Sequence, residues 1–177
     1  MKQEIIMAGF GGQGIMMMGK LLTYAGMKEE KEVSWMPSYG PEMRGGTANC
    51  TVIISDNLIP SPMSSKPDSI IVMNLPSLDK FLPKVKSGGT VFMNSSLIEE
   101  EVTRDDVKVI KIPANKIANE LGNSRIANMV MLGSFVEEKN IVKAETVKES
   151  LESVLSARNQ DLIDLNIKAL EKGKEFK

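Results

Sequence analysis

The residues with the clearest chemical potential form a glycine-rich segment near the start of the chain, Gly9-Phe10-Gly11-Gly12-Gln13-Gly14. The segment follows a short apolar run and precedes a longer one, which is typical of a loop between a strand and a helix. Glycines let a ligand approach the backbone, and the free N–H groups of a first helical turn attract phosphate or carboxylate. We therefore predict a cofactor-binding or anion-binding loop formed by Gly9, Gly11, Gly12, Gln13 and Gly14. The alternative is that these glycines only permit tight packing of a helix on a strand.

An ordinary dinucleotide site makes a second demand, which this sequence does not meet. In such sites a carboxylate at the end of the second strand holds the ribose hydroxyls. The corresponding segment, Val33–Pro37, contains no Asp or Glu, and Glu29, Glu30 and Glu32 precede the expected strand. The sequence therefore argues against NAD or FAD but leaves other anionic ligands open.

A second unusual segment combines glycines and prolines with one aromatic ring, one carboxylate and one guanidinium. Arg44, next to two glycines, is suited to hold a phosphate or a partner's carboxylate through two parallel hydrogen bonds. The plainer interpretation is a surface loop with an Arg44–Glu42 ion pair, which would contribute less than about 1 kcal/mol. We predict that Arg44 also contributes to cofactor binding and that the loop contacts a ligand or a partner through Tyr39, Gly40, Pro41, Glu42, Arg44, Gly45 and Gly46.

Several kinds of chemistry are missing from the sequence. Cys50 is the only cysteine and histidine is absent, so the 177 residues hold no disulfide, no CxxC pair and no cysteine set for an iron–sulfur cluster. We predict no catalytic and no metal-binding residue. The net charge of −1 gives no general attraction for nucleic acid or an anionic membrane. With no signal peptide and no apolar stretch of about 20 residues, we expect a cytoplasmic location.

The order of patterns along the chain predicts one α/β domain over residues 1–177. Short, mostly apolar runs indicate strands at Ile5–Ala8, Val33–Met36, Thr47–Ser55, Ser69–Met73, Thr90–Met93 and Val107–Ile112. From Pro113 onward the apolar residues follow a helical period, and we expect the charged end, Glu171–Lys177, to fray. The predicted fold is a three-layer domain with a largely parallel sheet, a Rossmann-like strand–glycine loop–helix start and a helical C-terminal third.

These motifs, taken together, resemble the gamma subunit of 2-oxoacid:ferredoxin oxidoreductases. The resemblance rests on strand-GFGGQG-helix, then YGPEMRGG, then a strand ending in Ser55-Asp56, followed by a proline-rich loop. The last third is also similar to that family, through Gly122-Asn123, Asn128–Gly133 and Asn166–Gly173. The resemblance covers essentially the whole chain.

The resemblance implies a function within a complex. Such complexes decarboxylate a 2-oxoacid on thiamine diphosphate, pass electrons through iron–sulfur clusters to ferredoxin, and form an acyl-coenzyme A. It places the thiamine diphosphate, its magnesium ion and the clusters on partner subunits, and it makes coenzyme A a candidate ligand of this chain. The partners implied are those subunits and, indirectly, ferredoxin. We expect the isolated chain to be inactive and able to form a homodimer.

A different class of function also fits the glycine loop. The chain would then be a free-standing Rossmann-like nucleotide-binding module or sensor, forming its own functional unit. Adjacent genes for thiamine and ferredoxin-like subunits would favour the complex, whereas binding of NAD or ATP by the chain alone would favour the module.

Overall fold

A computed structural model describes residues 1–38, 47–155 and 162–177 of the chain. All the described strands lie in the first two thirds of the chain, and helices make up most of the last third, as predicted. The strands are β1 (Lys2–Phe10), β2 (Glu32–Ser38), β3 (Thr47–Ser55), β4 (Ser69–Val72), β5 (Thr90–Asn94) and β6 (Lys108–Ile112). The helices are α1 (Ile15–Lys28), α2 (Leu75–Phe81), α3 (Ala114–Glu120), α4 (Ala127–Lys139), α5 (Ala144–Val154) and α6 (Ile163–Gly173), with short 3₁₀ turns η2 (Leu82–Lys84) and η3 (Ser124–Ile126).

The described strands form one mixed sheet of six strands in the order β2-β3-β1-β4-β5-β6. Neighbours from β1 through β4 and β5 to β6 are parallel, whereas β3 is antiparallel to both β1 and β2. Because β3 alone among these strands runs against the others, the prediction of a largely parallel sheet is confirmed.

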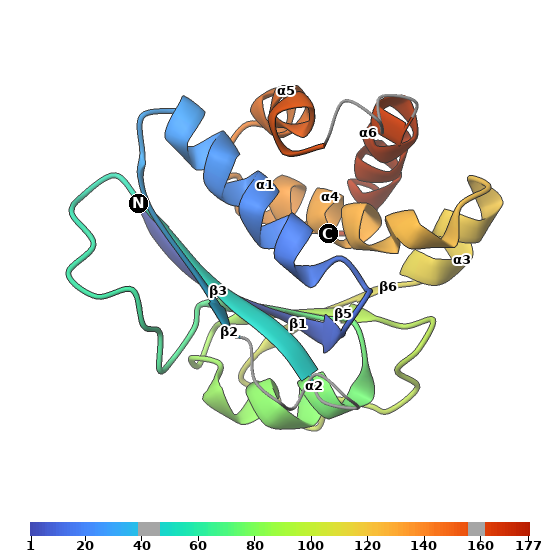
Figure 1. Ribbon diagram of the computed structural model, residues 1–177. Helices are drawn as coiled ribbons and strands as arrows, with labels where there is room; N and C mark the ends of the chain where they lie inside the picture. Colours follow the sequence, from blue (N-terminus) through green and yellow to red (C-terminus); the bar gives the residue numbers. More distant parts are fainter. Residues whose placement is uncertain (39–46, 156–161) are drawn as a thin grey trace.

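The sheet is covered on both faces, which makes three layers (Figure 1). Helices α1, α3, α4, α5 and α6 lie over one face, and α2 lies over the other. Two clusters of buried apolar side chains fill the two interfaces, the larger one beneath α1 and α4. Burial from both sides explains why Ile5–Ala8 is continuously apolar rather than alternating.

Helix α1 packs closely on β2 and β3 because two of its residues lack a side chain. A Cβ atom on Gly19 would lie 2.6 Å from Sγ of Cys50 and 2.8 Å from Nε1 of Trp35. A Cβ atom on Gly26 would lie 2.7 Å from Cγ1 of Val33. These approaches offset the helix-propensity cost of a glycine in a helix, about 1 kcal/mol relative to alanine.

Helices α4 and α6 approach even more closely, backbone against backbone. A Cβ atom on Gly133 would lie 2.1 Å from the carbonyl oxygen of Leu170, and one on Gly173 would lie 2.0 Å from that of Val130. The reciprocal arrangement allows no relief by a side-chain rotation, because the obstructing atoms belong to the main chain.

The C-terminal end contacts the body of the domain. In the segment Glu171–Lys177, which we expected to fray, α6 continues to Gly173, and the half-buried Phe176 packs against the larger core. The hydroxyl of Ser134 in α4 donates a hydrogen bond to the carbonyl oxygen of Phe176 at 2.7 Å. The end of the chain is thus held against α4. The charged composition of the last residues gave no indication of this contact.

Gly133→Ala should lower the free energy of unfolding by about 2–3 kcal/mol, because the added methyl group must push two helix backbones apart. Equilibrium urea unfolding measures this change. Lys168→Ala, on the exposed side of α6, serves as a control that alters the same helix pair without touching their contact. A Gly133→Ala variant as stable as this control would contradict the proposed close contact.

Cys50 is a buried structural residue. Its side chain is fully inaccessible, and its thiol donates a long hydrogen bond to the carbonyl oxygen of Ile15 at 3.7 Å. Burial raises the pKa of the thiol to about 12, against a smaller lowering by the nearby indole of Trp35. The group is therefore a neutral thiol at physiological pH and not a nucleophile.

Cys50 should react with a disulfide reagent such as dithionitrobenzoate more than a hundredfold slower in the folded chain than in urea. A Ser153→Cys variant, which adds an exposed thiol in α5, should label one of its two thiols at once. Since folding raises the thiol pKa, its contribution to stability is retained below about pH 9 and lost as the pH rises beyond that value. Rapid labelling of native Cys50 at pH 7 would contradict its burial.

Candidate functional site

The glycine loop connects the carboxyl end of β1 to the amino end of α1. Gly12 and Gly14 have φ angles of 89° and 74°, in the left-handed region that favours glycine. Gly14 is the residue that precedes the first turn of α1, and no side chain caps that turn. The helix therefore begins with backbone N–H groups that its own chain does not cap.

Gln13 closes the loop on itself. Its Oε1 accepts a hydrogen bond from the N–H of Phe10 at 2.6 Å, and its own N–H donates to the carbonyl oxygen of Phe10 at 3.2 Å. The side chain therefore braces the turn, and a direct role of Gln13 toward a ligand stays a prediction.

Gly9 and Gly14 have packing reasons to be glycine. A Cβ atom on Gly9 would lie 2.9 Å from Cβ of Met73, and one on Gly14 would lie 2.3 Å from Nδ2 of Asn128. The same Nδ2 donates a hydrogen bond to the carbonyl oxygen of Gly14 at 3.2 Å, which ties α4 to the loop. For these two glycines the structure supports the packing interpretation that the sequence left open.

Gly11 is different, because nothing within the described chain requires it to be glycine. A Cβ atom on Gly11 would meet no atom within 4 Å, and its φ is not positive. Gly12 also faces open space, but its positive φ angle is by itself a reason for glycine at this position. The free side of the loop is therefore bare backbone at Gly11 and Gly12.

Two depressions flank this bare backbone. The first, about 350 Å³, extends over the start of α1 and is lined by Phe10, Gly11, Gly12, Gly14, Ile15, Met16, Met17 and Ala48. The second, about 180 Å³, is lined by Gly12, Gln13, Met73, Asn115, Ser124, Arg125 and Ala127. Among the described residues, no acidic side chain lines either depression, so the described surroundings of the loop do not repel an anion.

Of the described residues, Arg125 is the one basic side chain that lines either depression, and sequence reasoning did not single it out. It lies in η3, just before α4, and it is exposed. Arg125 is more than 100 residues from the glycine loop in sequence. The two lie close together in the fold because α4 packs beside α1. The available signal was its position just before α4, a helix whose first ten residues are buried.

The sheet order adds a second argument against an ordinary dinucleotide site. In such folds the second strand pairs directly with the first. Here β3 occupies that place, and β2 lies beyond it at the edge of the sheet. The end of β2 is therefore displaced from the glycine loop, and it also carries no carboxylate.

The second predicted loop, Tyr39–Gly46 with Arg44, lies outside the described residues. Its flanking residues are Ser38, the last of β2, and Thr47, the first of β3. Thr47 pairs with Phe10 across the sheet, and Ala48 lines the larger depression. Both flanking residues therefore lie at the end of the strands that also bears the glycine loop.

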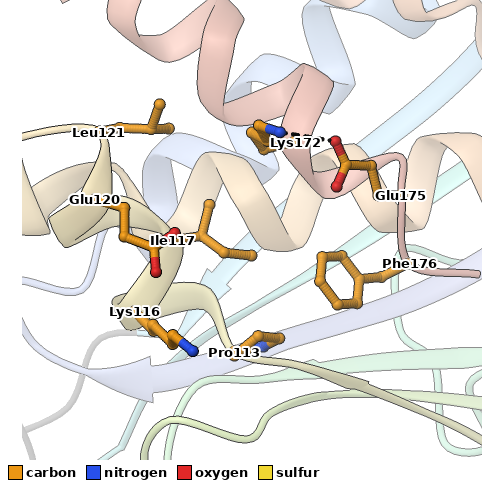
Figure 2. A pocket seen from close by; sticks show the side chains of 8 residues that line it. All are labelled: Pro113, Lys116, Ile117, Glu120, Leu121, Lys172, Glu175 and Phe176. Atoms are coloured by element: carbon orange, nitrogen blue, oxygen red, sulfur yellow. Dashed lines mark hydrogen bonds and ion pairs between the residues drawn. The ribbon is translucent and has the colours of Figure 1, made fainter.

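A third cavity, about 450 Å³, lies between α3 and the end of the chain (Figure 2). Its apolar wall is formed by Pro113, Ile117, Leu121 and Phe176, and its charged residues are Lys116, Glu120, Lys172 and Glu175. Lys172 and Glu175 form an ion pair at 2.9 Å. Because both signs of charge are balanced and no predicted site residue is present, this cavity gives no comparable preference for an anion.

Among residues 1–38, 47–155 and 162–177, no group of three or more His, Cys, Asp or Glu side chains is placed to hold a metal ion. Within the same residues, every helix is too short or too polar to cross a lipid bilayer.

Comparisons with known proteins identify relatives along the whole chain. The family model described as pyruvate ferredoxin/flavodoxin oxidoreductase matches residues 4–176. Ketoisovalerate oxidoreductase subunit VorA of Methanothermobacter marburgensis is 37% identical over 174 residues, which are 98% of this chain and 36% of that protein. The chain thus spans about one third of the length of this relative.

Two solved structures share the fold. The gamma subunit of a keto/oxoacid ferredoxin oxidoreductase from Geobacter sulfurreducens is 28% identical, with a TM-score of 0.84 over 98% of this chain and 96% of that one. The 2-oxoglutarate:ferredoxin oxidoreductase of Magnetococcus marinus, solved with 2-oxoglutarate, coenzyme A and succinyl-CoA bound, is 26% identical. Its TM-score is 0.89 over 98% of this chain and 30% of that chain.

The strand–glycine loop–helix start, the mixed six-strand sheet and the matched length all agree with these relatives. The chain belongs to the pyruvate ferredoxin/flavodoxin oxidoreductase family, as the gamma subunit of 2-oxoacid:ferredoxin oxidoreductases.

Proposed function

We propose that this chain works in a multi-subunit enzyme that oxidatively decarboxylates a 2-oxoacid, reduces ferredoxin and forms an acyl-coenzyme A. In this proposal the thiamine diphosphate, the magnesium ion and the iron–sulfur clusters reside on partner subunits. The chain supports assembly and binds part of coenzyme A. The choice of 2-oxoacid belongs to the partner subunits, since the relatives differ in the acid they are named for.

The observation that carries the coenzyme A proposal is Gly11. Its backbone has no positive φ, and among the described residues it has no neighbour that a methyl group would strike. A glycine that the fold does not need is explained by a ligand or partner that must come close to the backbone. The bound coenzyme A in the Magnetococcus relative supports the first of these two explanations.

The residues around Gly11 fit the phosphates of coenzyme A. The uncapped N-terminus of α1 offers N–H groups and the positive end of the helix dipole. Arg125 lines the adjoining depression, and no acidic residue of the described part of the chain lines either depression. Phe10, Met16 and Met17 supply an apolar surface for a less polar part of the ligand. When bound, coenzyme A supplies the thiol that takes up the acyl group.

The chain's own residues have limited parts in this proposal. The α1 N–H groups and a guanidinium hold phosphate oxygens, and the closed glycine turn fixes where those N–H groups point. Arg44 stays the guanidinium predicted from the sequence, and Arg125 is the one that the described residues bring to the loop. A free-standing nucleotide-binding module has less support, because the displaced β2 lacks the features of a ribose site.

Gly11→Ala in the assembled complex should leave folding unchanged and raise the KM for coenzyme A about tenfold or more. The added methyl group meets nothing among the described residues but occupies the space where the proposed ligand approaches. Steady-state kinetics with a viologen acceptor and varied coenzyme A measure this effect, while the KM for the 2-oxoacid should stay constant.

Matched variants separate the possible roles of the loop. Lys20→Ala, exposed in α1 away from both depressions, should leave all constants unchanged. Arg44→Ala and Arg125→Ala, made in turn, identify which guanidinium holds a phosphate. If Gly11→Ala weakens assembly, and the complex that still forms keeps the natural KM for coenzyme A, the loop contacts a partner and the ligand proposal fails.

The purified chain alone should not oxidise any 2-oxoacid with a viologen dye as acceptor. The sequence holds one cysteine and no histidine, so it cannot supply an iron–sulfur cluster with four cysteines or a histidine base. Adding the partner subunits purified from the source organism should restore activity. Turnover by the chain alone would contradict its proposed place as one subunit of a larger enzyme.

A further inference from the structure

A loop projects from the fold between β3 and β4, and we call residues 56–68 the arm; its charged residues are Asp56 at its start and Lys66 and Asp68 near its end. It contains no helix or strand, and Figure 1 shows it in turquoise to green, extending away from the layers. Its tip, Asn57–Met63, has no charged residue, although one quarter of the chain is charged. Leu58 and Met63, at 84% and 70% exposure, are the most exposed large apolar side chains of the described residues.

The start of the arm is fixed to the body of the domain by Asp56. The Nζ atom of Lys31 lies 2.8 Å from Oδ1 of Asp56. Hydrogen bonds from Lys31 and from the N-terminal ammonium lower the pKa of Asp56 to about 2. This attachment is therefore ionised throughout the physiological range of pH.

The end of the arm is fixed to β1 and to the segment before β5. The hydroxyl of Ser64 donates to Oε2 of Glu4 at 2.5 Å, and Oδ2 of Asp68 accepts from the N–H of Glu4 at 2.8 Å. The Nζ atom of Lys86 donates a further hydrogen bond to Oδ1 of Asp68 at 2.7 Å, which also holds this end of the arm. Burial disfavours the charged form of Glu4, but hydrogen bonds from Lys2 and Ser64 outweigh it and lower the pKa.

Two prolines restrict the tip between these fixed ends. Pro60 and Pro62 each lock one backbone φ angle, so the tip has fewer conformations to lose when something binds it. An apolar tip with anchored ends and a restricted backbone is suited to insert into a pocket on another protein. The flexible thioether of Met63 can adapt to the shape of such a pocket.

We propose that the tip of the arm, through Leu58 and Met63, inserts into an apolar pocket on a partner polypeptide of the same complex. The partner is the polypeptide that corresponds to the rest of the longer relatives. This chain matches 36% of VorA and 30% of the Magnetococcus chain, so in both relatives most of the polypeptide lies outside this domain and is linked to it. The inference rests on the proposed function, because it requires the complex.

The chemistry of the tip favours a protein over a lipid surface. Anionic membranes attract segments with several Lys or Arg residues, and Asn57–Met63 has none. The nearest charged group along the chain is the carboxylate of Asp56, which such a membrane would repel. An uncharged tip with two apolar side chains agrees with the composition of the buried centre of a protein interface.

The arm and the glycine loop lie at opposite ends of β1. Lys2 pairs with Ser55 at the end that bears the arm, and Phe10 pairs with Thr47 at the end that bears the glycine loop. Eight residue steps along an antiparallel strand span about 27 Å. Substitutions in the tip should therefore affect assembly without touching the ligand site.

The test uses the double variant Leu58→Asp/Met63→Asp, expressed together with the subunits that co-purify with the chain. The isolated variant should fold with an unchanged melting temperature, because both side chains are exposed. Its affinity for the partner subunits, measured by analytical ultracentrifugation, should be at least tenfold weaker than that of the natural chain. Any complex that forms at high concentration should keep its KM for coenzyme A.

Leu97→Asp provides the matched control, since Leu97 is an exposed leucine in a turn after β5 and far from the arm in sequence. It should assemble normally. Full assembly of the double variant at natural affinity would overturn the inference. So would a result in which the natural chain alone is a dimer and the double variant is a monomer that still binds its partners, because a second copy would then occupy the tip. Failure of the coenzyme A proposal would instead appear as an unchanged KM in Gly11→Ala.

Discussion

The close seating of α1 on the sheet is the constraint on which the site depends. Gly19 and Gly26 let the helix axis approach β2 and β3, and Gly9 and Gly14 let the helix start directly after β1. With these four positions free of side chains, the amino end of α1 emerges at the carboxyl edge of the sheet. The hydrogen bond from Asn128 to Gly14 then joins that edge to α4. The anion-ready N-terminus is thus held by packing on three sides.

Much of this arrangement could be predicted from residue patterns. The continuous apolar run in β1 indicated a strand buried on both faces, and the glycines after it indicated the turn into α1. The helical period after Pro113 indicated the helices of the last third, and the first ten residues of the apolar helix α4 are buried. Such features are local, because a strand or helix records its own degree of burial in its own sequence.

The remaining features depend on distant contacts that local patterns do not record. The β-branched run Thr51–Ile54 identified β3 as a strand, but nothing in it specified insertion between β1 and β2. The charged composition after Gly173 concealed Phe176, whose place depends on Ser134 in another helix. The GxGxxG pattern likewise treats its glycines as equal, whereas the neighbours of Gly9 and Gly14 come from β4 and α4 and those of Gly11 are absent from the described chain.

The size of the site supports the proposed division of labour. Pockets for drug-sized ligands enclose about 300–1,000 Å³. The larger depression at the glycine loop is about 350 Å³, and coenzyme A, with a nucleotide, a pyrophosphate and a long pantetheine arm, exceeds a typical drug in size. A ligand of that length can leave only part of itself on this chain, so its reactive thiol must extend toward groups held elsewhere. The absence of histidine and the burial of Cys50 agree with the proposed function, because the sequence offers the thiol no imidazole base and its one cysteine is inaccessible. In that proposal the bare backbone of Gly11 and Gly12 faces one end of the ligand, and a partner subunit holds the other end.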